Sequence, residues 1–219
     1  MPQETMVSKL QRSAQSAPLR LPRAGGVVRL LAKRLFDIGL SLAILGFLLP
    51  LVALTILALY IEDRGPILFR EVRIGLTGRH FQLLRLRTSL PEDEGGDWIG
   101  VADNAPAFTA LGTLLHLTRI DQIPQLFNIL RGDMSFVGPR PERPRTVSAL
   151  AHRLQDYSHR HQVRPGLTGY AQLQCPTTSP MADAERKLTL DLAYIDEQSL
   201  WRDVKILIDT LLFHLLSRR

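Results

Sequence analysis

The feature that most restricts the fold is a run of 24 residues without a charge, from Ile38 to Ile61. As a straight helix this run is about 36 Å long, which is enough to cross the hydrocarbon core of a bilayer. Pro50 lies near its centre, and a proline inside a helix removes a backbone hydrogen bond and bends or breaks the helix. The run therefore predicts a membrane element over residues 27–64 that is interrupted near Pro50.

Three topologies are open for this element. It can enter the membrane, break near Pro50 and return to the same face as a re-entrant hairpin, it can span the bilayer, or it can lie buried in a soluble protein. Residues 1–26 precede it and are rich in Ser, Pro and Arg, so we expect a disordered basic tail there. Such a tail is either simply solvated or held at the anionic cytoplasmic leaflet.

The composition of the chain limits its class of partner. The formal net charge is +6 and the sequence pI is near 10.0, which indicates an anionic ligand such as a nucleotide or an acidic lipid. A nucleic-acid binder would explain the charge but not the apolar run, so we expect no nucleic-acid partner. The single cysteine, Cys175, excludes an internal disulfide framework. The sequence also lacks a P-loop, a Rossmann glycine set and zinc-binding spacings.

The rest of the chain is expected to combine helices with short strands. Strand-like segments at residues 67–69 and 81–86 flank a turn at residues 75–78. Helices are expected near residues 111–118, 149–161, 183–194 and 200–216. The last of these is apolar over much of its surface, so it is either an interfacial helix or a helix packed in the core.

Three arginines outside the apolar run are candidates for binding phosphate. Arg85 and Arg87 alternate with apolar residues, so on a strand both side chains point to one face. Arg140 lies between Pro139 and Pro141, which restrict its backbone, and a preorganised guanidinium loses little freedom when it binds an anion. Guanidiniums gathered in this way suit the phosphates of a nucleotide.

Several segments together resemble the signature of the bacterial sugar transferases, the monotopic phosphoglycosyl transferases. They are Lys33-Arg34-Leu35-Phe36-Asp37, Asp121-Gln122-Ile123-Pro124-Gln125, Gly132-Asp133-Met134-Ser135, Val137-Gly138-Pro139-Arg140-Pro141 and Val163-Arg164-Pro165-Gly166-Leu167-Thr168-Gly169-Tyr170. The likeness runs from about Lys33 to the C-terminus. Members of this family move a phospho-sugar from a nucleotide diphosphate sugar to a polyprenyl phosphate at the membrane.

The resemblance assigns the chemistry to Asp121. It implies that this carboxylate attacks the β-phosphate of the donor, carries a covalent phospho-sugar and contacts a magnesium ion. Gln122 stands where the family usually has Glu, and glutamine lacks the negative charge that Mg²⁺ prefers. Three outcomes are open: substrate phosphates hold most of the metal, another acid such as Asp133 or Glu142 replaces the missing one, or the protein is weakened or inactive.

The resemblance also implies roles for residues around Asp121. The implied phosphate-binding set is Arg85, Arg87, Arg119 and Arg140. Nucleotide or loop contacts are assigned to Arg164, Gly166 and Tyr170, and lipid phosphate or membrane contacts to Lys33, Arg34, Asp37 and Pro50. Each of these residues has a plainer alternative role in a structural ion pair or a loop. The segment Ala105–Gly112 lacks two arginines and an aspartate that the family usually has there.

These observations predict an α-rich α+β fold. Residues 1–26 form the basic tail, 27–64 a re-entrant membrane hairpin, and 65–219 a cytoplasmic, membrane-associated catalytic domain with short strands and interfacial amphipathic helices. The resemblance implies transfer from a UDP-sugar to undecaprenyl phosphate at the cytoplasmic face of the bacterial inner membrane, which releases UMP and starts an exopolysaccharide repeat unit. A homodimer is left open. The alternative is a catalytically inactive membrane protein of the same fold that binds lipid or assembly partners.

Overall fold

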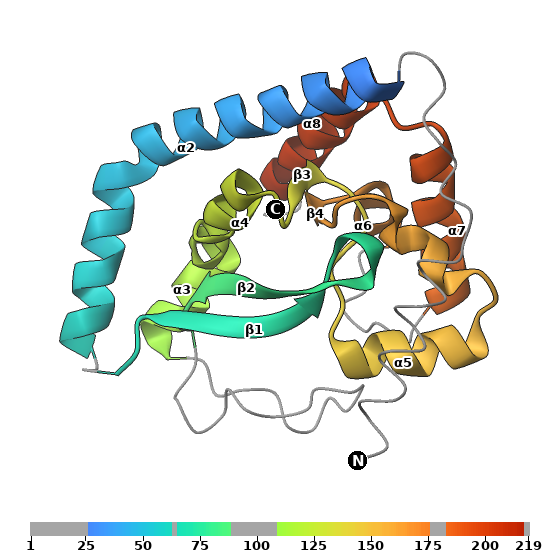
Figure 1. Ribbon diagram of the computed structural model, residues 1–219. Coiled ribbons are helices and arrows are strands. Elements are labelled where there is room, and N and C mark those ends of the chain that lie inside the picture. The colour runs from blue at the N-terminus through green and yellow to red at the C-terminus, as the bar shows by residue number, and fades with distance from the viewer. Residues whose placement is uncertain (1–25, 63–64, 89–108, 176–182, 217–219) are drawn as a thin grey trace.

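The computed structural model describes residues 26–62, 65–88, 109–175 and 183–216 (Figure 1). Most of this described chain is helical, and its strands are few and short. The α-rich fold expected from the sequence is therefore confirmed. The basic tail expected over residues 1–26 lies outside the described residues, apart from Gly26, which begins the first helix.

Helix α2 (Gly26–Glu62) is the apolar element that the sequence predicts. It contains Pro50 but does not end there, and it continues as one bent helix (Figure 1). Proline has no amide hydrogen, so the carbonyl of Gly46 loses its usual helical partner and the two limbs can tilt apart. The interruption expected near Pro50 is thus a bend within a continuous helix.

Most of the α2 surface is not covered by the rest of the protein. Its buried residues are Asp37, Ser41, Thr55 and Leu59, of which only the last is apolar. Large apolar side chains stay exposed along the helix, among them Leu35, Leu42, Phe47, Leu49, Leu54 and Leu57. By length and composition α2 is a candidate membrane span. A soluble core helix shows the opposite pattern, so the exposed surface favours contact between α2 and lipid.

Strands β1 (Leu68–Ile74) and β2 (His80–Leu86) form an antiparallel hairpin. A short 3-10 segment, η1 (Leu76–Gly78), makes the turn between them. The expected hairpin is confirmed, although its first strand is longer than the sequence indicates. The register pairs Arg85 with Phe69, close to the open end of the hairpin.

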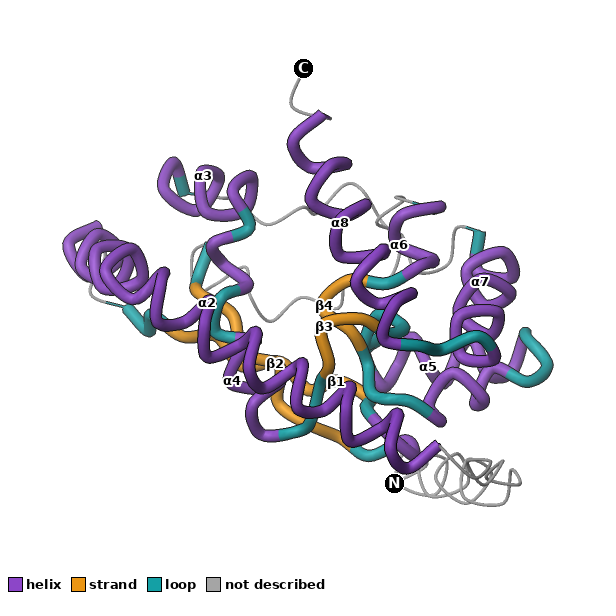
Figure 2. Tube along the Cα trace, turned by 90° about the horizontal axis from the view of Figure 1, so that it is seen from above, coloured by secondary structure: helices purple, strands orange, loops and turns teal. Residues whose placement is uncertain are grey.

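A second group of elements packs beside α2. Helix α3 (Ala110–Thr118), the 3-10 turn η4 (Ile120–Gln122) and helix α4 (Gln125–Arg131) follow one another, and α4 lies against α2 (Figure 2). Helix α4 ends at Gly132, whose φ of 94° lies in the left-handed region that favours glycine. Strand β3 (Ser135–Val137) begins three residues later, so the glycine redirects the chain into the core.

Strand β3 pairs in parallel with β4 (Gly166–Thr168) and belongs to the main apolar core. That core also receives side chains from the hairpin, from α4 and from the C-terminal helices α7 (Ala184–Asp196) and α8 (Leu200–Leu216). Its buried members are Leu83, Ile123, Leu126, Ile129, Met134, Phe136, Val137, Tyr194 and Ile206. Segments that are far apart in the sequence therefore meet around β3.

The single helix expected over residues 149–161 is wrong. Helix α5 spans Pro144–Arg153, and a separate 3-10 segment, η5 (Tyr157–Gln162), follows it. Asp156 takes a left-handed φ of 61° between them, which interrupts the helix. The interruption turns η5 towards α7. The short helix α6 (Tyr170–Gln174) comes after β4.

Helix α8 packs against the protein on one side only. Asp203 and Ile206 are its buried residues. Large apolar side chains stay exposed elsewhere on it, including Trp201, Leu211, Leu212, Leu215 and Leu216. One side of α8 is therefore packed in the core, whereas the rest is an exposed apolar surface, and an interfacial position of that surface stays a prediction.

His161 in η5 makes the stability of the fold sensitive to acid. Burial, and after it the charge of Arg160, lowers the pKa of His161 from 6.5 to about 3. The unfolded chain takes up a proton below pH 6.5, whereas the folded chain does so only near pH 3. The free energy of unfolding is therefore expected to fall as the pH drops through this window.

The His161→Gln variant should flatten this decline by up to about 1 kcal/mol per pH unit, because the side chain that titrates is gone. Thermal melts between about pH 7 and 4.5 measure the slope. His152 is exposed on α5, so His152→Gln is the control and should keep the wild-type slope. If His161→Gln also keeps it, His161 is not the source of the acid sensitivity.

Candidate active site

Asp121 lies in η4, at the junction between α3 and α4. Arg119 precedes it in the left-handed conformation, with a φ of 62°, which few residues other than glycine adopt. This conformation ends α3 and turns the chain, and the Asp121 side chain is completely buried. Pro124 then forms the N-cap of α4. The local backbone therefore holds this carboxylate in one place.

Arg85 binds one oxygen of the Asp121 carboxylate. Its Nη2 donates to Asp121 Oδ2 at 2.7 Å, and His116 Nδ1 lies 3.9 Å from the same oxygen. Among the described residues, the other oxygen, Oδ1, is buried and has no hydrogen-bond partner. A buried polar atom without a partner is costly. The carboxylate is thus oriented through Oδ2, and Oδ1 marks the place where a ligand group would be accepted.

Asp121 stays ionised although it is buried. Burial alone would raise the pKa of this carboxyl, but the nearby His116 imidazole and the hydrogen bond and positive charge of Arg85 outweigh it, and the pKa lies below its ordinary value. A carboxylate that is deprotonated at neutral pH needs no base before it attacks an electrophile. The surroundings of Asp121 therefore suit a nucleophile.

Further guanidiniums lie around Arg140, and one of them is that of Arg85, which binds Asp121. Part of the Arg140 side chain is exposed, but the protein packed around it lowers its pKa, and so do the positive charges of Arg73, Arg85 and Arg119, while Glu142 opposes the shift. Arg73, Arg85 and Arg119 therefore lie near enough to Arg140 to act on its charge, and one of the three, Arg85, binds Asp121. Such mutual repulsion is relieved when a multiply charged anion binds. The arrangement suits a diphosphate.

Backbone contacts hold the segment that carries Arg140. Gly138 N donates to Thr168 O at 3.0 Å, and Gly166 N donates to Pro139 O at 2.9 Å. A Cβ built on Gly166 would lie 2.1 Å from Gly138 N, so only glycine allows the two chains to approach this closely. The structure thus places Gly166 against the Arg140 segment, which agrees with the loop contact expected there, and the nucleotide contact stays a prediction.

The two acids considered as replacements at the Gln122 position lie in different surroundings. Gln122 itself is half-buried at the end of η4. Asp133 Oδ2 accepts a hydrogen bond from Asn128 Nδ2 at 3.4 Å, beyond the end of α4. Glu142 acts on the pKa of Arg140 and so belongs to the arginine cluster. Of these two acids, Glu142 is the one that the structure places with the cations.

Arg87 does not share the surroundings of Arg85. Its guanidinium is buried, and Nη2 lies 3.5 Å from the carbonyl oxygen of Leu59 in α2. Strand β2 ends at Leu86, one residue before Arg87, so the strand alternation behind the expectation does not extend to it. Arg85 contacts the carboxylate, whereas Arg87 contacts helix α2.

Arg164 and Tyr170 also have protein partners. Arg164 Nε donates to the carbonyl of Gly132 at 2.8 Å, at the C-terminal end of α4. The Arg202 guanidinium lies over the Tyr170 ring, 5.0 Å from its centroid. These contacts join β4 and α6 to α4 and α8. The expected nucleotide contacts of both residues stay predictions.

The polar residues at the start of α2 bind protein groups, whereas we expected lipid phosphates. Lys33 Nζ contacts Asp203 Oδ2 at 2.5 Å. Arg34 donates through Nη2 to the carbonyl of Leu130 at 2.7 Å. Asp37 Oδ1 accepts from the Phe136 amide at 3.2 Å. These three contacts attach α2 to α8, to the end of α4 and to β3, and the role of Pro50 is the bend described above.

Several residues of this framework had no role assigned from the sequence, although the spacing of Asp191 and Tyr194 resembles that of the family. Tyr194 OH donates to Asp203 Oδ1 at 2.7 Å, next to Lys33, and the two residues are fully buried. Arg160 pairs with Asp191 at 2.8 Å. Both Asp191 and Tyr194 lie on α7 three residues apart, a spacing that places them on one face of a helix and could have indicated a shared role. No sequence pattern indicates a role for His116, because its contact with Asp121 depends on the turn at Arg119.

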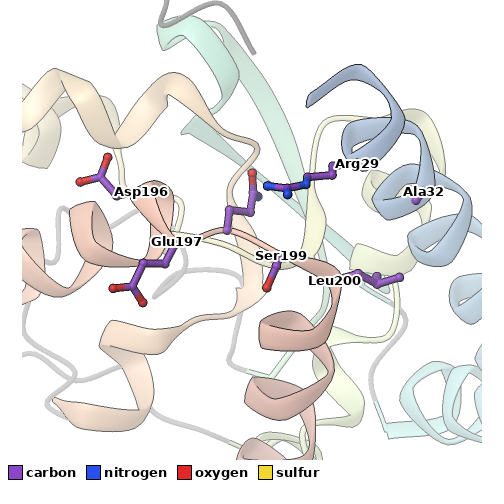
Figure 3. A pocket seen from close by; sticks show the side chains of 7 residues that line it. Arg29, Ala32, Asp196, Glu197, Ser199 and Leu200 are labelled. Atoms are coloured by element: carbon purple, nitrogen blue, oxygen red, sulfur yellow. The ribbon is translucent and has the colours of Figure 1, made fainter. Parts of the chain in front are cut away.

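A pocket of about 320 Å³ lies at a different place, between the start of α2 and the α7–α8 connection (Figure 3). Its lining residues are Arg29, Ala32, Asp196, Glu197, Gln198, Ser199 and Leu200. None of the candidate catalytic residues belongs to this set. The pocket is therefore separate from the carboxylate and the arginine cluster, and the chemistry is better assigned to the latter.

Comparison with known proteins adds independent evidence. Residues 28–217 match the family described as bacterial sugar transferase. A UDP-glucose:undecaprenyl-phosphate glucose-1-phosphate transferase of Caulobacter vibrioides is 39% identical, over 87% of this chain and 71% of that protein. An undecaprenyl-phosphate glucose phosphotransferase of Komagataeibacter xylinus is 37% identical, over 86% of this chain but only 37% of that protein. The exopolysaccharide production protein PSS of Rhizobium leguminosarum bv. phaseoli is 35% identical, over 85% and 96%.

Proposed function

Because the chain belongs to the bacterial sugar transferase family, we propose that it transfers a sugar 1-phosphate from a UDP-sugar to undecaprenyl phosphate. The observation that carries the proposal is the buried, ionised carboxylate of Asp121, oriented by Arg85, which is itself one of the cations that act on Arg140. The Caulobacter and Komagataeibacter relatives are named as glucose transferases, so glucose is the first donor sugar to test. The Rhizobium relative's name supports a role in exopolysaccharide synthesis.

The proposed reaction has two displacement steps. In the first, Asp121 Oδ1 attacks the β-phosphorus of the donor and forms an oxygen–phosphorus bond. The bond from that phosphorus to the bridging oxygen breaks, and UMP leaves with the bonding electrons. In the second, an oxygen of undecaprenyl phosphate attacks the same phosphorus, the acyl phosphate bond breaks, and the carboxylate is restored. Both nucleophiles are anions, so neither must lose a proton.

The arginines would act by binding and neutralising the donor phosphates. The Arg85 guanidinium lies 2.7 Å from Asp121 Oδ2, and 28% of the Arg85 side chain is exposed. Arg85 can therefore contact both the carboxylate and an incoming anion. Arg140 is exposed and surrounded by other cations, so an anionic ligand relieves its repulsion. Arg119 is exposed two residues before Asp121. Charge neutralisation and positioning are the main contributions a protein makes to phosphoryl transfer.

A magnesium ion would fit this site with Asp121 as its protein ligand. No group of three or more His, Cys, Asp or Glu side chains that could hold a metal occurs among the described residues. Mg²⁺ often binds through one or two carboxylates, with substrate phosphates and water completing its shell. The carboxylate of Asp121 matches that mode, and Gln122 lacks the charge for a second such ligand. When bound, the ion would neutralise phosphate charge.

Transfer is tested with the purified full chain, undecaprenyl phosphate in detergent and UDP-glucose labelled in the glucose moiety and in the β-phosphate. Label from both positions is expected in the lipid fraction, together with one UMP for each lipid product. UDP-galactose and UDP-N-acetylgalactosamine are run in parallel to define the sugar. If no UDP-sugar yields a labelled lipid with or without magnesium, the proposed transfer is wrong.

Gln122 favours a second candidate, a non-catalytic membrane protein of the same fold. Glutamine removes a negative charge next to the nucleophile, at a position where the family usually has Glu. In that case wild-type protein and Asp121→Asn would both fail in the assay above, while both would still bind membranes. Activity that appears only in Gln122→Glu would identify this single residue as the cause.

We further propose that α2 is re-entrant and that the catalytic domain faces the cytoplasm, at the bacterial inner membrane. Three observations support this: the bend at Pro50, the exposed apolar surface of α2, and the attachment of its polar start to the domain through Lys33 and Asp37. In intact cells, Val28→Cys and Glu62→Cys should both resist a membrane-impermeant maleimide added outside. Labelling of one of them would indicate a spanning helix. A homodimer stays an open prediction, which light scattering in detergent can test.

A further inference from the structure

The guanidinium of Arg160 contacts three groups that come from different parts of the chain. Nη1 donates to the Tyr157 hydroxyl at 2.6 Å, and Nη2 donates to Asp191 Oδ2 at 2.8 Å and to the main-chain carbonyl of Arg140 at 3.1 Å. Arg160, Asp191 and Tyr157 are all buried. This one side chain therefore joins η5 and α7 to the segment that carries a candidate phosphate-binding arginine.

The Arg140 segment depends on such external donors. Pro139 and Pro141 have no amide hydrogens, so the segment offers few donors of its own to hold it in place. Its three consecutive carbonyls accept hydrogen bonds from three separate elements. The donors to Pro139, Arg140 and Pro141 are Gly166 N at 2.9 Å, Arg160 Nη2 at 3.1 Å and Arg73 Nη1 at 3.0 Å. The backbone on both sides of Arg140 is thereby fixed.

A role in stability alone explains this arrangement poorly. A buried ion pair such as Arg160–Asp191 must offset the loss of hydration of both charges, and apolar residues of similar size often stabilise a fold as well. Burial by itself would lower the pKa of Arg160, but Tyr157 and Asp191 raise it, so the guanidinium stays charged. A guanidinium can donate a directed hydrogen bond to the Arg140 carbonyl, which an apolar side chain cannot do.

We propose that Arg160, oriented by Asp191, is a positioning residue that holds the Arg140 main chain so that the Arg140 guanidinium meets the diphosphate of the donor. The proposal rests on the proposed function, because it takes Arg140 as a ligand of the nucleotide phosphates. Arg160 itself acts from within the protein, through the Arg140 backbone. Its effect on ligand binding should therefore exist only while the Arg140 side chain is present.

A double-mutant cycle read out by UDP affinity tests this. UDP binding to the detergent-solubilised full chain is measured for wild type, Arg160→Lys, Arg140→Gln and the double variant. Arg140→Gln should weaken UDP binding by about 10- to 100-fold, as expected for loss of a charged hydrogen bond. Arg160→Lys keeps the positive charge but loses the planar guanidinium with its several N–H donors. It should weaken UDP binding about 10-fold when Arg140 is present and less than about twofold in the Arg140→Gln background.

Two further variants separate positioning from folding. Asp191→Asn removes the charge that orients Arg160, and should weaken UDP binding in the same direction as Arg160→Lys. Tyr194→Phe is the control, because it removes a buried hydrogen bond to Asp203, 2.7 Å long, without touching Arg160. It should lower the melting temperature and leave UDP affinity unchanged. All affinities are compared per folded protein.

Three results would overturn the proposal: equal weakening by Arg160→Lys in both backgrounds, a lower melting temperature with unchanged UDP affinity in Arg160→Lys and Asp191→Asn, or a wild type that does not bind UDP. The same preparations are assayed for transfer to undecaprenyl phosphate. If the cycle behaves as expected but no sugar phosphate is transferred, the proposed reaction fails and the positioning role stands.

Discussion

The Asp121→Asn variant is expected to transfer sugar phosphate at least about a thousandfold more slowly than the wild type. Asparagine keeps the shape of the side chain, and its carbonyl oxygen can still accept the hydrogen bond that Arg85 donates at 2.7 Å. It has no anionic oxygen to attack the β-phosphorus, so the first displacement is lost while the local fold remains. The measurement is the initial rate of label transfer from UDP-glucose to undecaprenyl phosphate.

Asp156→Asn is the matched control for this variant. Asp156 is exposed, and its left-handed φ of 61° is one that asparagine also tolerates, so this change should leave the rate unaltered. With wild-type protein and no lipid acceptor, about one equivalent of UMP and a protein-bound label are expected, and neither should appear with Asp121→Asn. Full activity in Asp121→Asn would exclude this carboxylate as the nucleophile and with it the proposed two-step reaction.

The Gly166→Ala variant is expected to lower the free energy of unfolding by at least about 3 kcal/mol. A Cβ at this position would lie 2.1 Å from Gly138 N and 2.3 Å from Thr168 O. Both are main-chain atoms, so no side-chain rotation can relieve the contact and β3 must move away from β4. For a chain of this size the melting temperature should fall by about 6–12 °C, which differential scanning fluorimetry in detergent measures.

Gly39→Ala provides the comparison. Gly39 lies in α2, and a Cβ there meets nothing within 4 Å, so this change should be neutral or stabilise the helix by up to about 1 kcal/mol. The pair also separates the two interpretations of Gly166. If Gly166→Ala kept the wild-type melting temperature and lost only UDP binding, the nucleotide contact suggested by the sequence would be right and close packing would not be the reason for glycine.

Some structural predictions succeeded because they depend on neighbours in the sequence. The hairpin around η1 follows from the turn residues at 75–78 and the apolar segments beside them. The apolar helix follows from an uncharged run, and Pro50 marks its bend because the missing amide is a local property. The prediction of a helix over residues 149–161 failed because Asp156 adopts a left-handed conformation. Packing of η5 against α7 stabilises this conformation, and it cannot be inferred from the residue type.

The contacts of the arginines show where local reasoning ends. Arg85 and Arg87 are equivalent by strand alternation, yet one binds Asp121 Oδ2 and the other lies 3.5 Å from a carbonyl oxygen of α2. Lys33 is a typical interfacial cation by sequence, yet it binds Asp203, 170 residues away. Which partner a long charged side chain takes is decided by what the fold brings within its reach.

By itself, the sequence determined the family and the apolar helix with its proline, and it singled out Asp121, Arg85 and Arg140 as candidates for the chemistry. These depend on residue type and short spacing, which carry through to the folded state. Only the tertiary structure decided that Asp121 is buried with one oxygen on Arg85 and that Arg160 holds the Arg140 backbone. Such contacts join segments that meet only after the core around β3 has formed, so no local pattern records them.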